Sequence, residues 1–481
     1  MSVLPKCVLL LSLLFYFVNY SAALPAIANA TIIQNWNGEV KSIPKAIFEP
    51  YNLTELQTIV QQAKANNIEL KVTGASHSMS AIFQTNGYLI MTHNLNAVSI
   101  EDPVNLLVRV QTGMTVNDLD TFLTANNMAL GSGTVISDLT IGGAVAAGCH
   151  GTGKGYSIMS DFVTEMRIVD SNGILQTYSG LILNTVKVNL GLFGIIYDVV
   201  LQVEPNRNVN YVAQTLPYTS VITGSALQSF FNNYDSLEIY YFPFASSVQV
   251  RTSHATTAAS TFNYTLYVES GLETVQIGLE YAPYFEADPT LLYETGSSGF
   301  DIFASVNDTR PLEYAVHYGY GIQGGPPFFN PEYVFPLNNN LAGFQAAANA
   351  INDTVTMIYN YYFQQGLAPV TYGLNIRFTK STQSLLSPAN TNTQYVMWMD
   401  ILLGVNAAGT TQFMSDIYNL LTTKYTAVPH WPKDWNQIPN TQNFNIGLFL
   451  AYRNFADADA TNIFVNDALS RLFVNKFAPY L

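Results

Sequence analysis

The stretch KVTGASHSMSAIFQTNGYLIM, residues 71–91, places a histidine between two serines, just past a glycine at the end of an expected strand. A second stretch, GSGTVISDLTIGGAVAAGCHGTGKGYSIMSDFV, spans residues 131–163 and is rich in glycine. Glycine allows positive φ and close approach of backbone N–H groups to a ligand, and consecutive exposed N–H groups suit a phosphate. The turns at 74–78 and 131–153 therefore predict a cavity for a pyrophosphate-bearing cofactor, with flexible loops as the alternative interpretation.

Neither stretch has the sequence of the common nucleotide-binding loops. The lysine pattern of a P-loop is missing, and no GxGxxG follows an expected strand. A P-loop or a Rossmann site is therefore disfavoured.

Helix and strand signals alternate through the first part of the chain. TELQTIVQQAKANN (54–67) has the apolar spacing of a helix that begins with a Thr54–Gln57 capping box, and Thr115 is expected to cap a second helix over 116–127. Strands are expected at 69–74 and 106–113, and the apolar face of the first helix consists of Leu56, Ile59, Val60 and Ala63. This alternation predicts a mixed α/β domain over residues 36–207.

The amino-acid composition of the sequence changes after Pro205. Residues 208–440 carry many tyrosines and phenylalanines in alternating runs such as LEIYYFPF (237–244) and QYVMWMDILL (394–403). This pattern is typical of an α+β domain on a large antiparallel sheet. The apolar tail, residues 441–481, is expected to pack back on the first domain.

The composition points to the secretory pathway. Only 11% of the 481 residues are charged, and residues 1–23 combine a basic residue, an apolar run at 7–18 and small residues, as a cleaved signal peptide does; an uncleaved anchor is the alternative. No later segment is apolar over the roughly 18–20 residues that a membrane-spanning helix needs. Five sequons are candidate glycosylation sites: Asn29, Asn52, Asn263, Asn307 and Asn352.

Charge and cysteine content exclude several classes of protein. The net charge of −14 argues against nucleic acid or an anionic membrane as a partner. Removal of residues 1–23 leaves Cys149 as the one cysteine, so an intrachain disulfide is not possible. The six histidines lack the spacing of a zinc site, and no metal is expected.

Several motifs in order resemble a known family. VTGASHS (72–78) with GTVISDLTIGGAVAAGCHGTG (133–153) resembles the vanillyl-alcohol-oxidase superfamily of FAD-linked oxidases, closest to the sugar-1,4-lactone and alditol oxidases. Further matches are NLGLFGIIYDVVLQVEP (189–205), PEYVFPLNN (331–339), NIRFTKSTQSLLSP (375–388) and PHWPK (429–433). The resemblance implies an α+β protein of two domains, a PCMH-type FAD-binding domain and a substrate cap.

The resemblance also assigns roles at the cofactor. It implies that His77 bonds covalently to the 8α-methyl of the flavin, because a neutral imidazole nitrogen is a nucleophile; the alternatives are a hydrogen bond from His77 or attachment at His150. Ser137 is also a candidate substrate contact. The other expected cofactor contacts are Gly74, Ala75, Ser76, Ser78, Ser137, Gly142, Gly143, Cys149, Gly151, Gly194 and Ile196.

The substrate site is expected around two cations. In resembling enzymes an arginine and a lysine at the positions of Arg377 and Lys433 meet the substrate, and such fixed charges stabilise a developing alkoxide. Solvated surface charge is the alternative for both. Asn375 stands where relatives usually have glutamate, which leaves the substrate open.

Other candidate residues accompany these two cations. Asp400 and Trp398 are candidate pocket groups, although the tryptophan also suits a core position. Cys149 stands where relatives more often have threonine, and an inert, buried thiol is expected there.

These observations predict a secreted FAD-dependent oxidase. A polyol, sugar or aldonolactone is expected to lose hydride from a hydroxyl-bearing carbon to flavin N5, and oxygen to become peroxide. The small residues Gly142, Gly143, Ala144, Ala146 and Ala147 would leave room for oxygen. The alternatives are a dehydrogenase that uses another electron acceptor and a non-catalytic secreted glycoprotein that binds carbohydrate.

Overall fold

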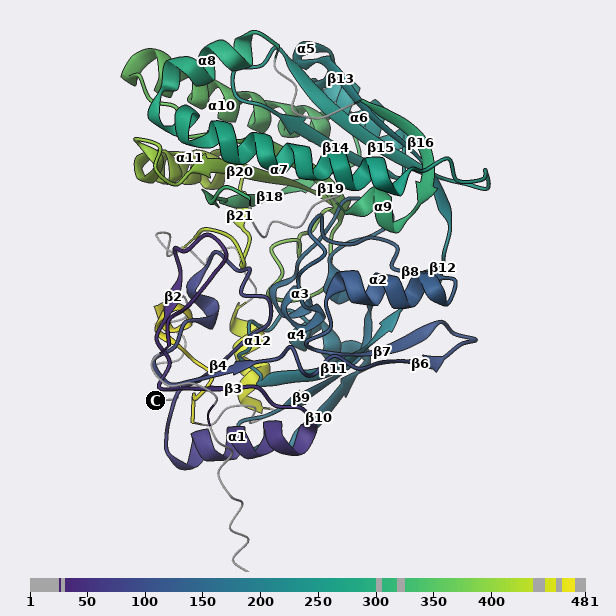
Figure 1. The fold of residues 1–481 in the computed structure, drawn as a ribbon, viewed down its shortest axis with the longest axis vertical. Coiled ribbons are helices and arrows are strands. Elements are labelled where there is room, and N and C mark those ends of the chain that lie inside the picture. The colour runs from purple at the N-terminus through teal and green to yellow at the C-terminus, as the bar shows by residue number, and fades with distance from the viewer. Residues whose placement is uncertain are drawn as a thin grey trace, which may run out of the picture.

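The computed structural model describes residues 26, 31–299, 305–317, 325–435, 446–455 and 461–471. Two domains lie one above the other in Figure 1, with the cap domain at the top. The signal-peptide prediction and the sequon at Asn29 lie outside the described residues. No helix in the described ranges combines the length and the apolar character needed to cross a bilayer.

The first domain is built on two main sheets. A parallel sheet has the order β3-β5-β4, and an antiparallel sheet has the order β10-β9-β11-β7-β6. The pairs β1–β2 and β12–β8 are separate. The strands are β1 (Ile33–Gln34), β2 (Lys41–Ser42), β3 (Ala46–Phe48), β4 (Leu70–Thr73), β5 (Tyr88–Met91), β6 (Val98–Asp102), β7 (Leu107–Gln111), β8 (Met128–Ala129), β9 (Val163–Val169), β10 (Leu175–Ser179), β11 (Ile195–Gln202) and β12 (Glu204–Pro205).

Short helices connect these strands. They are α1 (Leu53–Ala65), α2 (Val116–Ala125), α3 (Ile141–Ala147) and α4 (Leu183–Val186), with 3-10 turns η1 (Ala81–Phe83), η2 (Met159–Phe162) and η3 (Gly180–Ile182). Helix α1 buries the four apolar residues expected of it, and Thr115 caps α2 by accepting from the Asp118 N–H at 3.1 Å. The predicted cap of α1 was wrong, because Asn52 accepts from the Glu55 N–H at 3.0 Å, two residues before Thr54. Asparagine is as good an N-cap as threonine or better, so the helix begins at the earlier signal.

The cap domain carries the predicted large antiparallel sheet, which confirms the two-domain α+β fold. The order is β16-β13-β15-β14-β19-β20-β18-β21, with β17 paired to β20. Its strands are β13 (Asn208–Pro217), β14 (Ser236–Tyr241), β15 (Ser247–Thr256), β16 (Val306–Pro311), β17 (Phe328–Phe329), β18 (Glu332–Leu337), β19 (Gly373–Lys380), β20 (Tyr395–Gly404) and β21 (Val428–Pro429).

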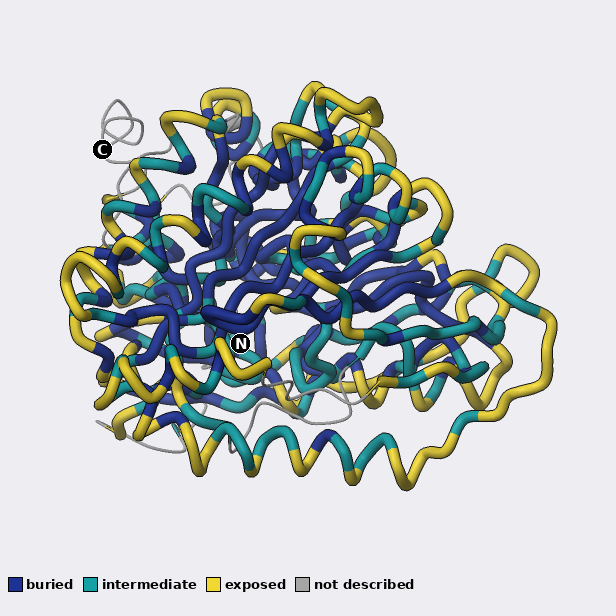
Figure 2. Tube along the Cα trace, turned by 90° about the horizontal axis from the view of Figure 1, so that it is seen from above, coloured by how far each residue is buried: buried dark blue, intermediate teal, exposed yellow. Residues whose placement is uncertain are grey.

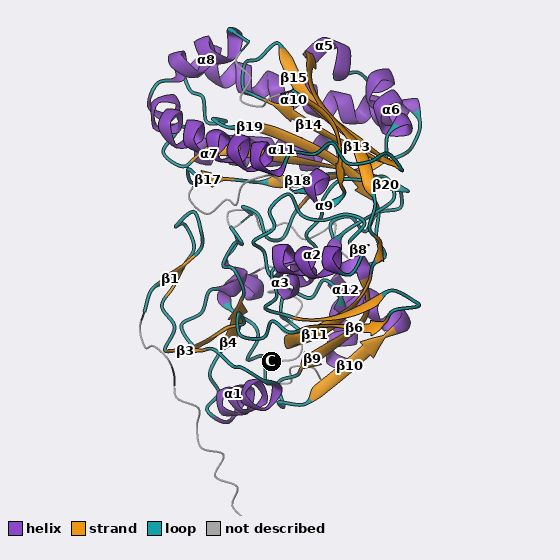
Figure 3. Ribbon diagram, turned by 45° about the vertical axis from the view of Figure 1, so that its right-hand side comes forward, coloured by secondary structure: helices purple, strands orange, loops and turns teal. Residues whose placement is uncertain are grey.

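Helices cover the side of this sheet away from the first domain (Figure 3). They include α6 (Gly224–Asn233), α8 (Pro289–Ser297) and α10 (Leu341–Gln365). The remaining cap helices are α5 (Tyr218–Val221), α7 (Tyr264–Ala287), α9 (Glu313–Val316) and α11 (Thr410–Lys424). The deep blue of buried residues in Figure 2 follows the sheets, whereas the outer helices and loops carry most of the exposed yellow.

Alternation along the central strands separates the cap core from the site. Successive side chains on a strand point to opposite faces. On β19, Leu374, Ile376 and Phe378 join the hydrophobic core beneath α10, so Asn375 and Arg377 face the other way, toward the first domain.

The C-terminal residues lie against the first domain. Helix α12 (Ile446–Phe455) packs Phe449 edge-on against Phe193, with ring centroids 5.3 Å apart. Arg453 Nε donates to the carbonyl of Leu192 at 2.6 Å, and the Leu70 N–H donates to the carbonyl of Ile463 at 2.7 Å. These contacts add residues from the C-terminal part of the chain to the hydrophobic clusters of the first domain.

Candidate functional site

A cavity of about 360 Å³ lies between the two domains, within the usual range for a ligand pocket. The two glycine-rich turns of the first domain and strands β14, β18, β19 and β20 of the cap contribute to its lining. The predicted site residues that line it are Gly74, Ala75, Ser76, His77, Ser78, Gly142, Gly143, Cys149, Gly194, Ile196, Asn375, Arg377, Asp400 and Lys433. The structure thus brings together most of the predicted set.

The two glycine-rich turns interlock at the bottom of this cavity. A Cβ atom on Gly74 would lie 1.9 Å from Thr140 Oγ1, and one on Gly142 would lie 1.8 Å from Thr112 Oγ1. A side chain at Gly74 would therefore push the two turns apart, and one at Gly142 would collide with the residue that follows β7. Ser76 has a φ of +52°, so the backbone reverses direction directly before His77.

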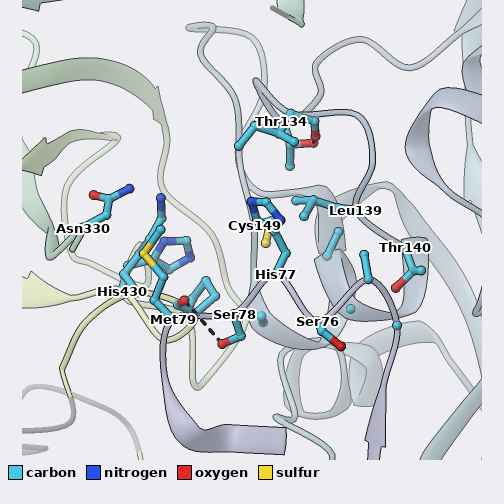
Figure 4. A pocket seen from close by; sticks show the side chains of 18 of the residues that line it. Ser76, His77, Ser78, Met79, Thr134, Leu139, Thr140, Cys149, Asn330 and His430 are labelled. Carbon is cyan, nitrogen blue, oxygen red and sulfur yellow. Dashed lines mark hydrogen bonds between the residues drawn. The ribbon is translucent and has the colours of Figure 1, made fainter. Parts of the chain in front are cut away.

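His77 is a neutral nucleophile inside this cavity. Its Nε2 atom is buried and has no hydrogen-bond partner among the described residues. Burial, and to a lesser degree the positive charge of Lys433, lower the pKa of His77 to about 4. The ring stacks on Trp36, with centroids 5.5 Å apart and planes 13° from parallel. Figure 4 shows His77 directed into the same space as Cys149 and Leu139.

The histidine turn is fastened to the turn that carries Lys433. The Met79 N–H donates to the carbonyl of Pro432 at 2.8 Å, and Ser80 Oγ donates to the carbonyl of Trp431 at 2.6 Å. His77 and Lys433 are 356 positions apart in sequence, yet these two bonds fix their turns against each other.

One row of residues crosses four strands of the cap sheet at the cavity. Register pairs Glu332 on β18 with Asp400 on β20, Asp400 with Asn375 on β19, and Asn375 with Tyr240 on β14. All four line the cavity. Arg377 lies two residues along β19 from Asn375, on the same face.

Two carboxylates and two cations form a compact cluster here. Arg377 Nη2 donates to Glu332 Oε1 at 2.8 Å and also contacts Asp400 Oδ2. Lys433 Nζ lies 3.0 Å from Asp400 Oδ1 and 4.0 Å from Glu332 Oε2. Burial lowers the pKa of Lys433, but Asp400 and Glu332 outweigh burial and raise it, so the ammonium is charged.

Glu332 is completely buried and is ionised all the same. Burial favours the neutral acid, but His150, Arg377 and Lys433 together hold the pKa of Glu332 well below its usual range. His150 Nε2 lies 2.9 Å from Glu332 Oε1, and His430 Nδ1 lies 2.6 Å from Oε2. Burial lowers the pKa of His150 to about 4. The formal charges of the two carboxylates and the two cations therefore cancel.

Three predicted site residues do not line the cavity. Trp398 is fully buried, stacks on His150 with ring centroids 3.4 Å apart, and donates from Nε1 to Thr379 Oγ1 at 2.8 Å. A Cβ atom on Gly151 would lie 2.0 Å from the carbonyl oxygen of Gly133, so that glycine serves loop packing. The carbonyl of Ser137 accepts from the Asn117 N–H at 2.9 Å. Trp398 supports the site from behind, as its alternative core interpretation requires.

Asn375 and Cys149, two predicted residues, both line the cavity. Asn375 Nδ2 donates to Glu238 Oε1 at 2.8 Å, so this amide meets a carboxylate from the neighbouring strand. Burial raises the pKa of the Cys149 thiol to about 12, which keeps it protonated and unreactive.

Sequence reasoning missed Glu332 and Asn330 as pocket residues. Glu332 stands in PEYVFPLNN, a motif that resembles the family, and the resemblance did not point to its carboxylate. Asn330 lies beside it, and its Oδ1 is buried without a hydrogen-bond partner in the described part of the chain. A charged residue at the start of an apolar strand was the available signal, because such a charge is rarely buried without a function.

The first domain has features that fit a flavin cofactor. The glycine turns leave a concave floor, and His77 supplies an unpartnered, neutral nitrogen there. This floor, which faces the charged strands of the cap across the cavity, suits the class of FAD-binding proteins.

Comparison with known proteins gives the family. Residues 44–179 match the model of an FAD binding domain, and residues 199–472 match the model described as D-arabinono-1,4-lactone oxidase. The second match covers more than half of the chain, so this chain belongs to the D-arabinono-1,4-lactone oxidase family.

Individual relatives are distant. The L-gulonolactone oxidase of Bos taurus is 28% identical over 221 residues, which cover 45% of this chain and 50% of that protein. The L-gulono-1,4-lactone dehydrogenase of Mycobacterium tuberculosis is 23% identical over 454 residues, 92% of this chain and 99% of that protein. The structure of a solvent-stable cholesterol oxidase superposes with a TM-score of 0.76 at 18% identity, covering 95% and 99% of the two chains. This chain thus aligns with about half the length of the bovine enzyme, and the cholesterol oxidase shares the fold.

Proposed function

We propose that this protein is an FAD-dependent oxidoreductase that oxidises a hydroxyl-bearing carbon of an aldonolactone, sugar or polyol. The observation that carries this proposal is one cavity with a neutral histidine on its FAD-domain floor and a charged Arg377–Lys433 pair on its cap side. Membership of the lactone oxidase family and the names of the bovine and mycobacterial relatives support an aldonolactone as the first substrate to try.

The chemistry divides between cofactor and protein. A bound isoalloxazine supplies the two-electron acceptor that takes hydride from the substrate carbon. Arg377 and Lys433 supply positive charge where the hydroxyl oxygen develops negative charge, in a cavity where such charge is weakly screened. Asp400 and Glu332 hold the two cations in place through the contacts given above. The preorganised cluster thus favours the transition state over the neutral alcohol.

We propose that His77 anchors the cofactor covalently. Formation of a bond from an imidazole nitrogen to the 8α-methyl carbon would release one N–H proton and one C–H proton, and oxygen would take up the two electrons left over. The low pKa of His77 keeps its nitrogen available as a nucleophile. The unpartnered Nε2 and the stacked Trp36 support a ring that is held ready for this reaction.

Oxygen is the proposed electron acceptor, and peroxide the second product. The second candidate is a dehydrogenase that passes its electrons to another acceptor. It is supported by the mycobacterial relative, which aligns with most of the chain and is named a dehydrogenase. Peroxide yield per mole of substrate in air, against dye reduction under argon, separates the two candidates.

The test of the reaction is anaerobic mixing of purified holoprotein with L-gulono-1,4-lactone, D-arabinono-1,4-lactone, xylitol and sorbitol. The proposal expects the flavin absorbance near 450 nm to bleach with at least one of them. A flavin-loaded protein whose spectrum stays unchanged with all of these and with a wider sugar panel would instead support the non-catalytic carbohydrate-binding alternative.

We further propose that the protein is secreted and carries glycans. Asn52, Asn263 and Asn307 are exposed, which an acceptor asparagine requires. Asn352 is half-buried within α10, where its Oδ1 accepts from the Tyr218 hydroxyl at 2.8 Å, so it is the least suitable acceptor. Endoglycosidase treatment of protein from a eukaryotic host is expected to increase gel mobility, and an Asn263→Gln variant is expected to lose more of that shift than Asn352→Gln.

A further inference from the structure

Two buried histidines, His150 and His430, flank Glu332, and each of their ring nitrogens faces an oxygen atom. His150 Nδ1 lies 2.9 Å from the carbonyl oxygen of Gly151, while its Nε2 faces Glu332 Oε1. His430 Nδ1 faces Glu332 Oε2, while its Nε2 lies 3.2 Å from the carbonyl oxygen of Gly148. All four ring nitrogens therefore face oxygen acceptors. An imidazole in its neutral form donates from one nitrogen alone, so beside an ionised Glu332 each ring in that form leaves one of its two contacts without a hydrogen.

Charge balance explains why the protons are missing at rest. Glu332, Asp400, Arg377 and Lys433 sum to zero, and any proton added to a histidine would leave net positive charge in a buried cluster. That cost is the reason that burial lowers the pKa of His150. The cost falls when negative charge forms nearby, because opposite charges stabilise each other strongly where water is excluded.

We propose that the His150–Glu332–His430 triad is a proton store that takes up one proton when negative charge forms in the cavity. This inference rests on the proposed oxidoreductase function. The oxidised alcohol gives up a hydride, which the bound flavin receives, and a hydroxyl proton, which ends in the triad. For each carbonyl product the cofactor would take the electron pair with the hydride and the triad would keep the proton, so atoms and charge balance.

Lys433 connects the cavity to the triad. About a fifth of its side chain is exposed, whereas Glu332 has no exposed side-chain surface. Its Nζ is 4.0 Å from Glu332 Oε2, close enough to hand one of its protons inward after a small movement and to take the hydroxyl proton in exchange. Trp398 covers the other side of His150 and closes that side of the triad.

The groups around the triad make a metal ion an unsuitable occupant. His150, Glu332 and His430 have the composition of a metal site. However, Arg377 Nη2 donates to Glu332 Oε1 and Lys433 lies within 4.0 Å of Oε2, so a divalent cation would meet two positive charges. A proton shared along the existing hydrogen bonds requires no such rearrangement.

The test is the midpoint potential of the bound flavin as a function of pH. For a two-electron couple, one proton taken up corresponds to about 30 mV per pH unit and two protons to about 59 mV. Between pH 7 and 8.5 wild-type holoprotein is expected to follow the two-proton slope, with one proton on the flavin and one in the triad. The His150→Gln, His430→Gln double variant is expected to follow the one-proton slope. His254→Gln, an exposed histidine on β15, is the matched control and should follow wild type.

A second measurement needs no variant. Photoreduction of wild-type holoprotein at pH 7.5 in weakly buffered solution with an indicator dye is expected to consume close to two protons per flavin. One proton per flavin, or equal slopes for wild type and double variant, would overturn the proton store while leaving the oxidoreductase intact. A preparation without flavin would instead overturn the proposed function itself.

Discussion

The two ends of the cavity are built in opposite ways. The floor around His77 is made by turns of the first domain, and the imidazole of His77 is neutral there. The cap side holds two carboxylates that the register of β18 and β20 places side by side. Arg377 from β19 and Lys433 from the turn after β21 form ion pairs with them. The comparison teaches that backbone shape builds one end of the cavity and paired charge builds the other, which matches the proposed division between a cofactor end and a substrate end.

The largest effect is expected at the centre of the charged end. Glu332→Gln leaves Arg377 and Lys433 beside one carboxylate in place of two, and breaking a buried ion pair in this way costs about 3–5 kcal/mol. Urea denaturation of the variant is expected to show that loss in the free energy of unfolding. Glu101→Gln, which removes an exposed partner of Arg109, is the control and should cost under about 1 kcal/mol. Equal losses for the two variants would mean that the charged end is not a coupled cluster.

Removal of one cation should affect the reaction more than the fold. Lys433→Met keeps the length of the side chain and removes the charge proposed to face the developing alkoxide. We expect the anaerobic rate of substrate-driven flavin bleaching to fall about 100- to 1000-fold, with flavin content unchanged. Lys424→Met, which removes a lysine from a surface pair with Asp353, should react at the wild-type rate. A wild-type rate for Lys433→Met would remove this residue from the mechanism.

Asn375 stands where relatives usually have glutamate, and an Asn375→Glu variant restores that carboxylate at the charged end of the cavity. Asn375→Glu would place a second carboxylate beside Glu238 Oε1, to which the Asn375 amide donates a hydrogen bond at 2.8 Å. Like charges raise the pKa of one partner, so the variant is expected to lose about 1–3 kcal/mol of unfolding free energy at pH 8 and to regain most of it near pH 5, where one carboxyl is protonated. Asn375→Gln, measured over the same pH range, should show no such recovery. A pH-independent loss in the glutamate variant would contradict the repulsion.

The smallest effect is expected at the neutral end. Trp36→Leu removes the ring stacked on His77 and leaves the charged residues of the cap side unchanged. An aromatic pair is worth about 0.5–1.5 kcal/mol, so covalent loading should slow by about 2- to 10-fold. Acid-stable flavin, followed over time after adding FAD to apoprotein, measures that rate. Substrate-driven bleaching of the fully loaded variant should match wild type, and slower bleaching would show that the two ends are not independent.

Much of the neutral end was predictable because it is local in sequence. Glycines of the two turns and His77 lie in short sequence motifs, and in the structure they line the same cavity. The buried face of α1 follows the apolar period of its sequence. The cap of α1 was misplaced because Asn52 and Thr54 are competing cap residues two positions apart.

The charged end was only partly predictable because long-range pairing creates it. Arg377, Asp400 and Lys433 were found through motifs. Glu332 was not, because its neighbours His150 and His430 are 182 and 98 positions away. Alternation on a strand tells which face a residue takes, but register alone decides which residue lies beside it.

The central claim is that the cavity floor holds FAD through His77. The most direct measurement is peptide mass spectrometry of acid-precipitated protein, together with its visible spectrum. A yellow precipitate, with the flavin mass on the peptide that contains His77 and its loss in His77→Ala, is the predicted result. A colourless precipitate with that peptide unmodified would contradict covalent attachment, and flavin on a peptide containing His150 would place the anchor on the wrong side of the cavity.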